Sequence, residues 1–197
     1  MVDLVIPCAE RTIRSLKAGD AVRISGLVHT GRDKFHKWFA EGGAVDVDFR
    51  GGALYHCGPV VVGGEGSWRV VAAGPTTSVR ENPYEPDFIR RSGVRVIIGK
   101  GGMDAATLEA MRECGAVYVQ AVGGAAAVSA AAVRRVAGVS LLEEFGAAEA
   151  CWHFEVEGFP GVVAMDSHGV SLFDRVDAGA ARRLGELLGR RAGGAAK

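Results

Sequence analysis

Two short loops near the middle of the chain place glycines, hydroxyls and cations directly after apolar runs. Residues 74–80 (GPTTSVR) follow the strand-like run 68–73, and residues 99–103 (GKGGM) follow the strand-like run 94–98. Glycines at a strand exit let backbone N–H groups approach a bound anion closely, and Lys100 adds a positive charge there. We therefore expect a small carboxylate or phosphate to bind between these two loops.

The hydrophobic pattern predicts an α/β fold. Strand and helix alternate over residues 94–136, which is typical of right-handed βαβ units, whereas the glycine- and valine-rich residues 42–66 indicate hairpin or barrel strands. The two prolines in residues 82–86 predict a rigid, turn-rich segment. Strands are expected over residues 4–6, 21–29, 53–57, 60–62, 68–73, 94–98, 116–120, 152–156, 161–165 and 170–173, and helices after Thr30 or Asp33, over 103–114 and 125–136, and from Asp177 to 188.

The chain is expected to form one domain over residues 1–189, followed by a flexible basic tail over residues 190–197. It has 197 residues, of which 48% are hydrophobic, and its net charge is zero. A neutral chain gives no electrostatic reason to expect nucleic acid or a membrane surface as a partner. The sequence has no signal-like segment and no apolar run of membrane-spanning length, so a cytoplasmic location is expected.

The chain has four cysteines that lie far apart in sequence: Cys8, Cys57, Cys114 and Cys151. We interpret them as reduced thiols that mostly fill core space, and we expect no metal site in this chain. His56 is interpreted as a structural histidine, because no second ligand type lies at a useful spacing. Asp166-Ser167-His168 is interpreted as a turn, since the members of a catalytic triad converge from separate elements.

Candidate anion-binding residues lie at the predicted strand exits: Arg32, Thr76, Thr77, Ser78, Arg80 and Lys100. Cations with hydroxyls between them suit a small dicarboxylate better than one phosphate, because arginine binds a carboxylate through a bidentate fork. The segment around Lys100 lacks the spacing and the Ser/Thr of a phosphate-binding Walker loop. A salt-bridged surface position remains the alternative for Arg32, and Gly123-Gly124 serves either helix packing or a second anion contact.

The two loops also carry a resemblance to a known family. Residues 74–80 (Gly-Pro-Thr-Thr-Ser-x-Arg) and 99–103 (Gly-Lys-Gly-Gly-Met) resemble, in this order and at this separation, the β subunit of the two-subunit iron–sulfur class I fumarases and L(+)-tartrate dehydratases. The resemblance spans nearly the whole chain. It includes residues 16–20 (LKAGD), Gly31-Arg32-Asp33 with His36, residues 158–160 (GFP) and residues 165–169 (MDSHG).

The resemblance implies a swivelling β/β/α domain, with a mixed sheet of barrel-like strands and flanking helices, that supplies half of an active site. It also implies that a separate α subunit holds a [4Fe–4S] cluster, whose open iron acts as a Lewis acid, and that the hetero-oligomer reversibly hydrates fumarate to malate. A homodimer of this chain in isolation is compatible with the resemblance. Carried over by motif, Thr76 moves the C3 proton, while Arg32, Arg80 and Lys100 bind the substrate carboxylates or hydroxyl.

The sequence leaves alternatives open. A threonine hydroxyl is a weak base, so Thr76 needs an activating group, which we expect from the partner chain; alternatively, Thr76 only shapes the loop or binds substrate. Relatives often carry methionine where this chain has Glu81, whose carboxylate is expected to compete for Arg80. L(+)-tartrate is the alternative substrate, and a non-catalytic carboxylate-binding module is the alternative function.

Overall fold

The computed structural model describes the backbone of residues 1–193 and the side chains of residues 1–188. The strands are β1 (Val2–Ile6), β2 (Ala21–Thr30), β3 (Ala53–Tyr55), β4 (Val60–Val62), β5 (Arg69–Ala72), β6 (Val96–Gly99), β7 (Val117–Gln120), β8 (Val133–Ser140) and β9 (Cys151–Met165). The helices are α1 (Glu10–Arg14), α2 (Asp33–Ala40), the 3-10 helix η1 (Ser78–Glu81), α3 (Glu85–Ser92), α4 (Ala105–Cys114), α5 (Ala126–Ala131), α6 (Leu142–Phe145) and α7 (Leu172–Gly193).

A closed sheet of five strands forms the centre of the molecule. Strand β2 pairs in parallel with β1 and then β3 along one edge, and antiparallel with the long β9 along the other. From β3 the sheet continues in parallel through β6 to β7, and β7 pairs with the last part of β9, which closes the barrel. The α/β fold with a mixed, barrel-like sheet is therefore confirmed.

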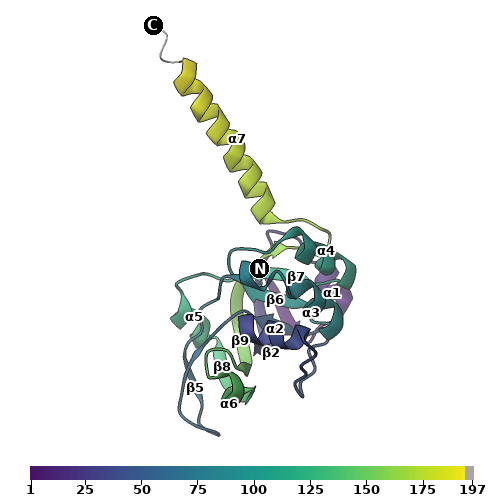
Figure 1. Cartoon of the computed structure of the whole chain (residues 1–197), viewed down its shortest axis with the longest axis vertical. Coiled ribbons are helices and arrows are strands. Elements are labelled where there is room, and N and C mark those ends of the chain that lie inside the picture. Colours follow the sequence, from purple (N-terminus) through teal and green to yellow (C-terminus); the bar gives the residue numbers. More distant parts are fainter. Residues whose placement is uncertain (194–197) are drawn as a thin grey trace.

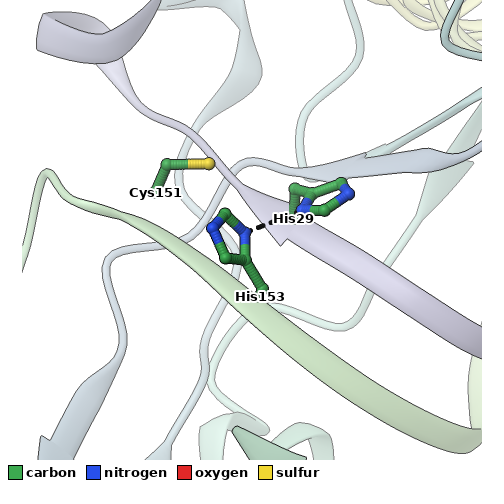
Figure 2. Close-up of side chains that lie close together, drawn as sticks. All are labelled: His29, Cys151 and His153. Atoms are coloured by element: carbon green, nitrogen blue, oxygen red, sulfur yellow. Dashed lines mark hydrogen bonds between the residues drawn. The ribbon is translucent and has the colours of Figure 1, made fainter. Parts of the chain in front are cut away.

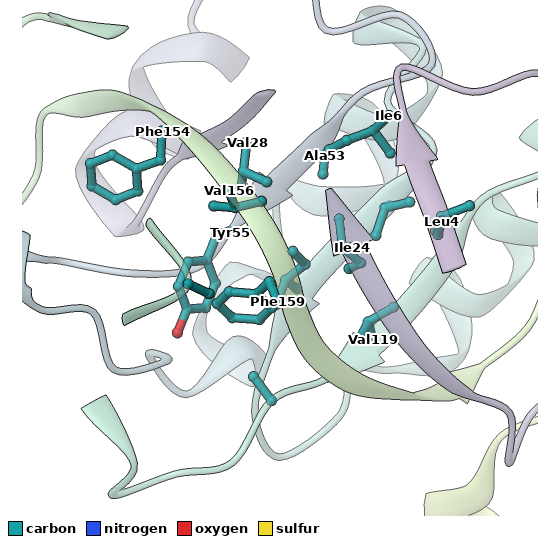
Figure 3. Close-up of a cluster of buried hydrophobic side chains, with 14 of the residues drawn as sticks. Leu4, Ile6, Ile24, Val28, Ala53, Tyr55, Val119, Phe154, Val156 and Phe159 are labelled. Atoms are coloured by element: carbon teal, nitrogen blue, oxygen red, sulfur yellow. The ribbon is translucent and has the colours of Figure 1, made fainter. Parts of the chain in front are cut away.

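The barrel interior holds the main hydrophobic core. Alternate residues of the strands point inward, among them Ile24, Val28, Tyr55, Val119 and Phe159, and Figure 3 shows several of these side chains between the surrounding strands. Each is almost completely buried. Burying a side chain of this size contributes about 1.5–3 kcal/mol, so this cluster holds the barrel closed.

Helices α2, α3 and α4 cover the outer face of the parallel strands, as Figure 1 shows. Outward-facing Leu54, Ile97 and Tyr118 pack there with Phe35 from α2 and Phe88 from α3. Strands β3 and β6 are therefore buried on both faces. This burial explains why their sequences are continuous apolar runs rather than alternating ones.

Two predicted elements were wrong in the second half of the chain. The helix expected over residues 125–136 is only α5, because Val133 begins strand β8, which pairs with the first part of β9. The alanine-rich pattern favoured a helix, but the sheet edge offered by β9 overrides that local preference. The strand expected over residues 170–173 is a single bridge between Met165 and Ser171.

Helix boundaries also differ from the predictions. Helix α7 begins at Leu172 rather than after Asp177, and the Ser171 hydroxyl accepts a hydrogen bond from the Asp174 N–H at 3.2 Å. The segment 82–86 ends in helix α3 rather than in turns alone, because Pro86 lies in the first helical turn, where proline is tolerated.

Helix α7 projects away from the barrel as a single long helix (Figure 1). The predicted flexible tail, residues 190–197, begins in the last turns of this helix, and residues 194–197 lie outside the described part of the chain. Within residues 1–193, no helix is both long enough and apolar enough to cross a bilayer.

Candidate active site at the carboxyl edge of the barrel

The carboxyl ends of β2, β3 and β6 lie at one edge of the barrel, because these strands run parallel. The loop 74–80 crosses this edge. The Thr76 N–H donates to the His56 carbonyl at 2.6 Å, and the Ser78 N–H donates to the Lys100 carbonyl at 3.0 Å. The loops 74–80 and 99–103 therefore lie side by side, as the sequence predicted.

The structure places the four predicted site residues along this edge. Arg32 is the N-cap of α2, and Arg80 and Lys100 come from the two loops, as does the half-buried Thr76. The Arg32 Nε lies 3.4 Å from a carboxylate oxygen of Glu149, and an Arg80 Nη lies 3.4 Å from one of Asp33. Both contacts are long for charged hydrogen bonds, so a substrate carboxylate can compete for either guanidinium.

A buried hydrogen-bond network supports the loop from below. Glu85 on α3 accepts from His56 Nε2 at 3.0 Å and lies 3.0 Å from His36 Nε2. His56 Nδ1 lies 2.9 Å from the Ser78 hydroxyl, which in turn lies 2.9 Å from the Tyr118 hydroxyl. Every side chain in this network is almost completely buried, so the network fixes the position of Ser78 within the loop 74–80.

The charges in this network are arranged as one ion pair and one neutral ring. Burial opposes the charged forms, but the mutual attraction of Glu85 and His36 raises the pKa of His36 and lowers that of Glu85 to about 2. Burial, helped by the charge on His36, lowers the pKa of His56. A cationic His36 can donate from Nδ1 to the Arg32 carbonyl, 2.9 Å away, so the network also holds the start of α2.

Glu81 does not compete for Arg80, which corrects the sequence expectation. Its side chain is buried beneath the loop, with Oε2 3.6 Å from His36 Nδ1, and Arg80 contacts Asp33 instead. Burial and the contact with the Asp33 carboxylate raise the pKa of Glu81 to about 8. Glu81 is therefore a protonated acid at neutral pH, and the Arg80 side chain remains at the surface.

Other parts of the anion-site hypothesis were wrong. The Ser78 hydroxyl is buried in the network and cannot contact a ligand at the surface. The Gly101 N–H donates to the Gln120 side chain at 3.2 Å, and the Asp104 carboxylate caps helix α4 by accepting from the Thr107 N–H at 2.9 Å. The Gly101 amide is therefore occupied, and the anion-binding role of Lys100 stays a prediction.

Two glycines in this loop serve close packing. A Cβ on Gly99 would lie 1.9 Å from the Ser78 hydroxyl oxygen, so only glycine lets the loop 74–80 approach β6. Gly102 has a φ of 77°, and a Cβ there would also meet the Phe173 ring at 2.6 Å.

Sequence reasoning did not predict the burial of Glu81, and it missed Glu85 altogether. It also found no ligand-type partner for His56, although the fold brings His36 and Glu85 to its side. Ser78 and Glu85 account for both ring nitrogens of His56, which supports a structural role for this histidine. The only sequence signal of this network is the presence of two acidic residues, Glu81 and Glu85, in a segment that the fold partly buries.

We expect Glu81→Gln to change the pH dependence of stability. The folded pKa of Glu81, about 8, lies above its ordinary value of 4.5. Its contribution to stability is therefore fully present below pH 4.5 and is lost as the pH rises toward 8. Between pH 5 and pH 8, the wild-type chain should lose more than about 1 kcal/mol of unfolding free energy relative to the variant, as measured by urea denaturation.

Glu113→Gln is the matched control for this experiment, because Glu113 is exposed and paired with Arg90 at the surface. The control should follow the wild-type pH profile. Parallel profiles for Glu81→Gln and wild type would show that Glu81 is ionised in the folded chain.

Comparisons with known proteins identify the family. Residues 1–176 match the family described as "Fumarase C-terminus". The chain is 48% identical over 188 residues to "Putative fumarate hydratase class I" of Geobacillus stearothermophilus, covering 95% of this chain and 36% of that protein. It is 39% identical over 185 residues to "Putative L(+)-tartrate dehydratase subunit beta" of Methanocaldococcus jannaschii, covering 91% of this chain and 95% of that protein.

A third relative, "L(+)-tartrate dehydratase subunit beta" of Escherichia coli K12, is 33% identical over 171 residues, which is 86% of this chain and 85% of that protein. The chain thus spans about a third of the Geobacillus protein but nearly the full length of the two β subunits. The matched region includes both loops of the candidate site. The resemblance inferred from the loop motifs is confirmed, and the chain belongs to the Fumarase C-terminus family.

Proposed function

We propose that this chain is the β subunit of a class I fumarate hydratase, a hydro-lyase that reversibly converts fumarate to malate. The observation that supports the proposal is that the segments carrying Thr76, Arg32, Arg80 and Lys100 all lie at one barrel edge in a chain of this family. Cations on separate elements can hold both carboxylates of a C4 dicarboxylate, which a single anion loop cannot do.

In this proposal, Thr76 exchanges the C3 proton while the cations orient the substrate. Arg32 and Arg80 bind carboxylates by bidentate hydrogen bonds, and Lys100 contributes charge to a carboxylate or to the hydroxyl. The buried network under Ser78 holds the loop that carries Thr76 and Arg80. A neutral threonine needs activation to act as a base, and the activating group is assigned to the partner chain.

The residues of this chain do not fit an iron–sulfur cluster. Such clusters are held by cysteine thiolates, and the groups of potential metal ligands in the described part of the chain include only one cysteine, Cys151. We therefore assign the [4Fe–4S] cluster to a separate α subunit.

The lengths of the relatives support a two-subunit arrangement. This chain matches nearly all of two proteins named as β subunits, whereas it matches 36% of the longer Geobacillus protein. We propose a hetero-oligomer of this chain with a cluster-binding α subunit, located in the cytoplasm. A homodimer of the isolated chain is compatible with this arrangement.

L(+)-tartrate is the second candidate substrate, because two relatives that match over most of their length are named L(+)-tartrate dehydratase subunits. The test is a panel of fumarate, L-malate and both tartrate enantiomers assayed with the assembled enzyme. The proposal expects kcat/KM for fumarate and malate to exceed that for either tartrate by at least about tenfold, a ratio worth about 1.4 kcal/mol. Preferential dehydration of L(+)-tartrate would identify an L(+)-tartrate dehydratase subunit instead of a fumarate hydratase subunit. No turnover of any of these four compounds would favour a non-catalytic carboxylate-binding module.

A further inference from the structure

A second cluster of polar side chains lies on the outer face of the barrel, where β2 and β9 pair. His29 on β2 is directly opposite His153 on β9, and Cys151 lies two residues before His153, on the same face of that strand. Figure 2 shows the three side chains gathered together. The two Nδ1 atoms are 2.8 Å apart, and one ligand atom from each residue lies within 4.8 Å of the others.

The two imidazoles are held in place by neighbouring groups. His153 Nε2 lies 3.0 Å from the Ser140 hydroxyl on β8, and the His29 ring packs edge-on against Phe49 with the centroids 5.0 Å apart. Donation from Nε2 to Ser140 leaves the Nδ1 lone pair of His153 directed at His29. Metal-binding histidines use the same arrangement, in which the second ring nitrogen donates to an outer hydrogen-bond partner.

We propose that His29, Cys151 and His153 bind one divalent transition-metal ion with the preferences of Zn²⁺. Two imidazole nitrogens and one thiolate are a donor set that zinc uses with water in the fourth position. Burial raises the pKa of the Cys151 thiol, so the metal must displace its proton: the S–H bond is replaced by a sulfur–metal bond and the proton goes to solvent. The hydrogen bond between the two Nδ1 atoms is lost as His29 moves its proton to Nε2, and both Nδ1 atoms bind the metal.

A cavity gives the metal access to this cluster. It has a volume of about 370 Å³ and is lined by His29, His153, Asp48, Leu27, Val47 and Ala137. The Asp48 side chain, which also lines this cavity, is ion-paired with Arg50. The cavity leaves room for the water that completes the coordination.

The proposed metal site adjoins the segment that contacts Arg32. Glu149, which faces Arg32, lies two residues before Cys151, and the Thr30 hydroxyl fastens this segment to β2 by donating to the Ala150 carbonyl at 3.1 Å. A metal bridging His29 and Cys151 would add a second link between the same strands. Bound metal is therefore expected to stabilise the folded chain and raise its Tm.

The test is titration of the purified, EDTA-treated full-length chain with ZnCl₂ and CoCl₂. The proposal expects one ion per chain, a thiolate-to-cobalt charge-transfer absorption, and release of about one proton per zinc. Cys151→Ser and His153→Gln should each weaken zinc binding by at least about tenfold, and Ser140→Ala by about 10–100-fold. Cys114→Ser and His168→Gln are matched controls outside the cluster and should bind as the wild type does.

Wild-type chain that binds no zinc at equimolar concentration, or that binds cobalt without the charge-transfer band, would overturn the proposal. Unchanged zinc affinity in a Cys151→Ser variant that is folded by circular dichroism would do the same. If that variant does not fold, X-ray absorption spectroscopy of the zinc-loaded wild-type chain identifies the metal ligands instead. One sulfur and two imidazole nitrogens around zinc are expected, and a shell of oxygen and nitrogen alone would contradict the site.

Discussion

Replacing Thr76 with alanine should lower kcat of the assembled enzyme by about 10²–10⁴-fold, the usual contribution of a proton-transferring side chain. KM should change little, because the interaction strengthens only in the transition state. The position of the residue supports this expectation: Thr76 is fixed by its N–H bond to the His56 carbonyl, so its hydroxyl is held at the edge that also presents Arg32, Arg80 and Lys100.

Thr76→Ser and Thr76→Val separate proton transfer from loop shape. Serine keeps the hydroxyl and should recover part of the lost kcat, whereas valine keeps the branched shape without the hydroxyl and should remain as slow as alanine. Thr77→Val is the matched control, because Thr77 is the adjacent, exposed threonine of the same loop. A Thr76→Val enzyme with near-normal kcat would assign Thr76 to loop shape alone.

Arg80→Ala and Arg32→Ala should each lower kcat/KM by a factor equivalent to about 2–5 kcal/mol, the range observed when one partner of a desolvated charge pair is removed. Lysine should not restore either activity fully, because it cannot form the bidentate fork. Steady-state kinetics on fumarate and malate provide the measurement. A loss mainly in KM would indicate uniform binding of substrate and transition state.

Arg23→Ala is the control for the arginine experiment. Arg23 lies near the start of β2, at the end opposite to Arg32, where it is exposed and paired with Asp3. Its loss should leave kcat/KM nearly unchanged. An Arg32→Ala enzyme as active as the Arg23→Ala enzyme would assign Arg32 to a surface ion pair with Glu149.

The edge of the candidate site could be predicted because the local sequence indicates where a strand ends. An apolar run such as residues 94–98 followed by Gly99 and Lys100 indicates both a buried strand and the loop after it. Parallel pairing then brings the exits of β2, β3 and β6 together without further information. The family motifs added roles for individual residues, which the strand pattern alone does not supply.

The support beneath the loop could not be predicted because it depends on contacts between distant segments. His36, His56 and Glu85 come from α2, the exit of β3 and α3, and no local spacing relates them. Ser78 was expected to face a ligand because it follows two threonines, yet its hydroxyl faces inward to His56. The direction of one side chain in a loop is set by packing, as the close approach of Gly99 to Ser78 shows.

Local propensity failed where tertiary pairing determined the structure. Residues 133–136 were expected to end the alanine-rich helix over 125–136, but pairing with β9 makes them the start of strand β8. The reverse applies at Pro86, which favoured a turn in sequence and instead occupies the first turn of α3. At β8 the deciding partner is an element that the local sequence does not contain, whereas at Pro86 the first helical turn tolerates proline.

The most direct test of the proposed division of labour is reconstitution under anaerobic conditions. The purified chain is assayed for fumarate hydration alone, and again after addition of the candidate α subunit carrying its iron–sulfur cluster. We expect no hydration above the uncatalysed rate from the chain alone and substantial turnover from the mixture, with activity saturating at a fixed ratio of the two chains. Substantial turnover by the chain before the α subunit is added would contradict the assignment of half an active site to this protein.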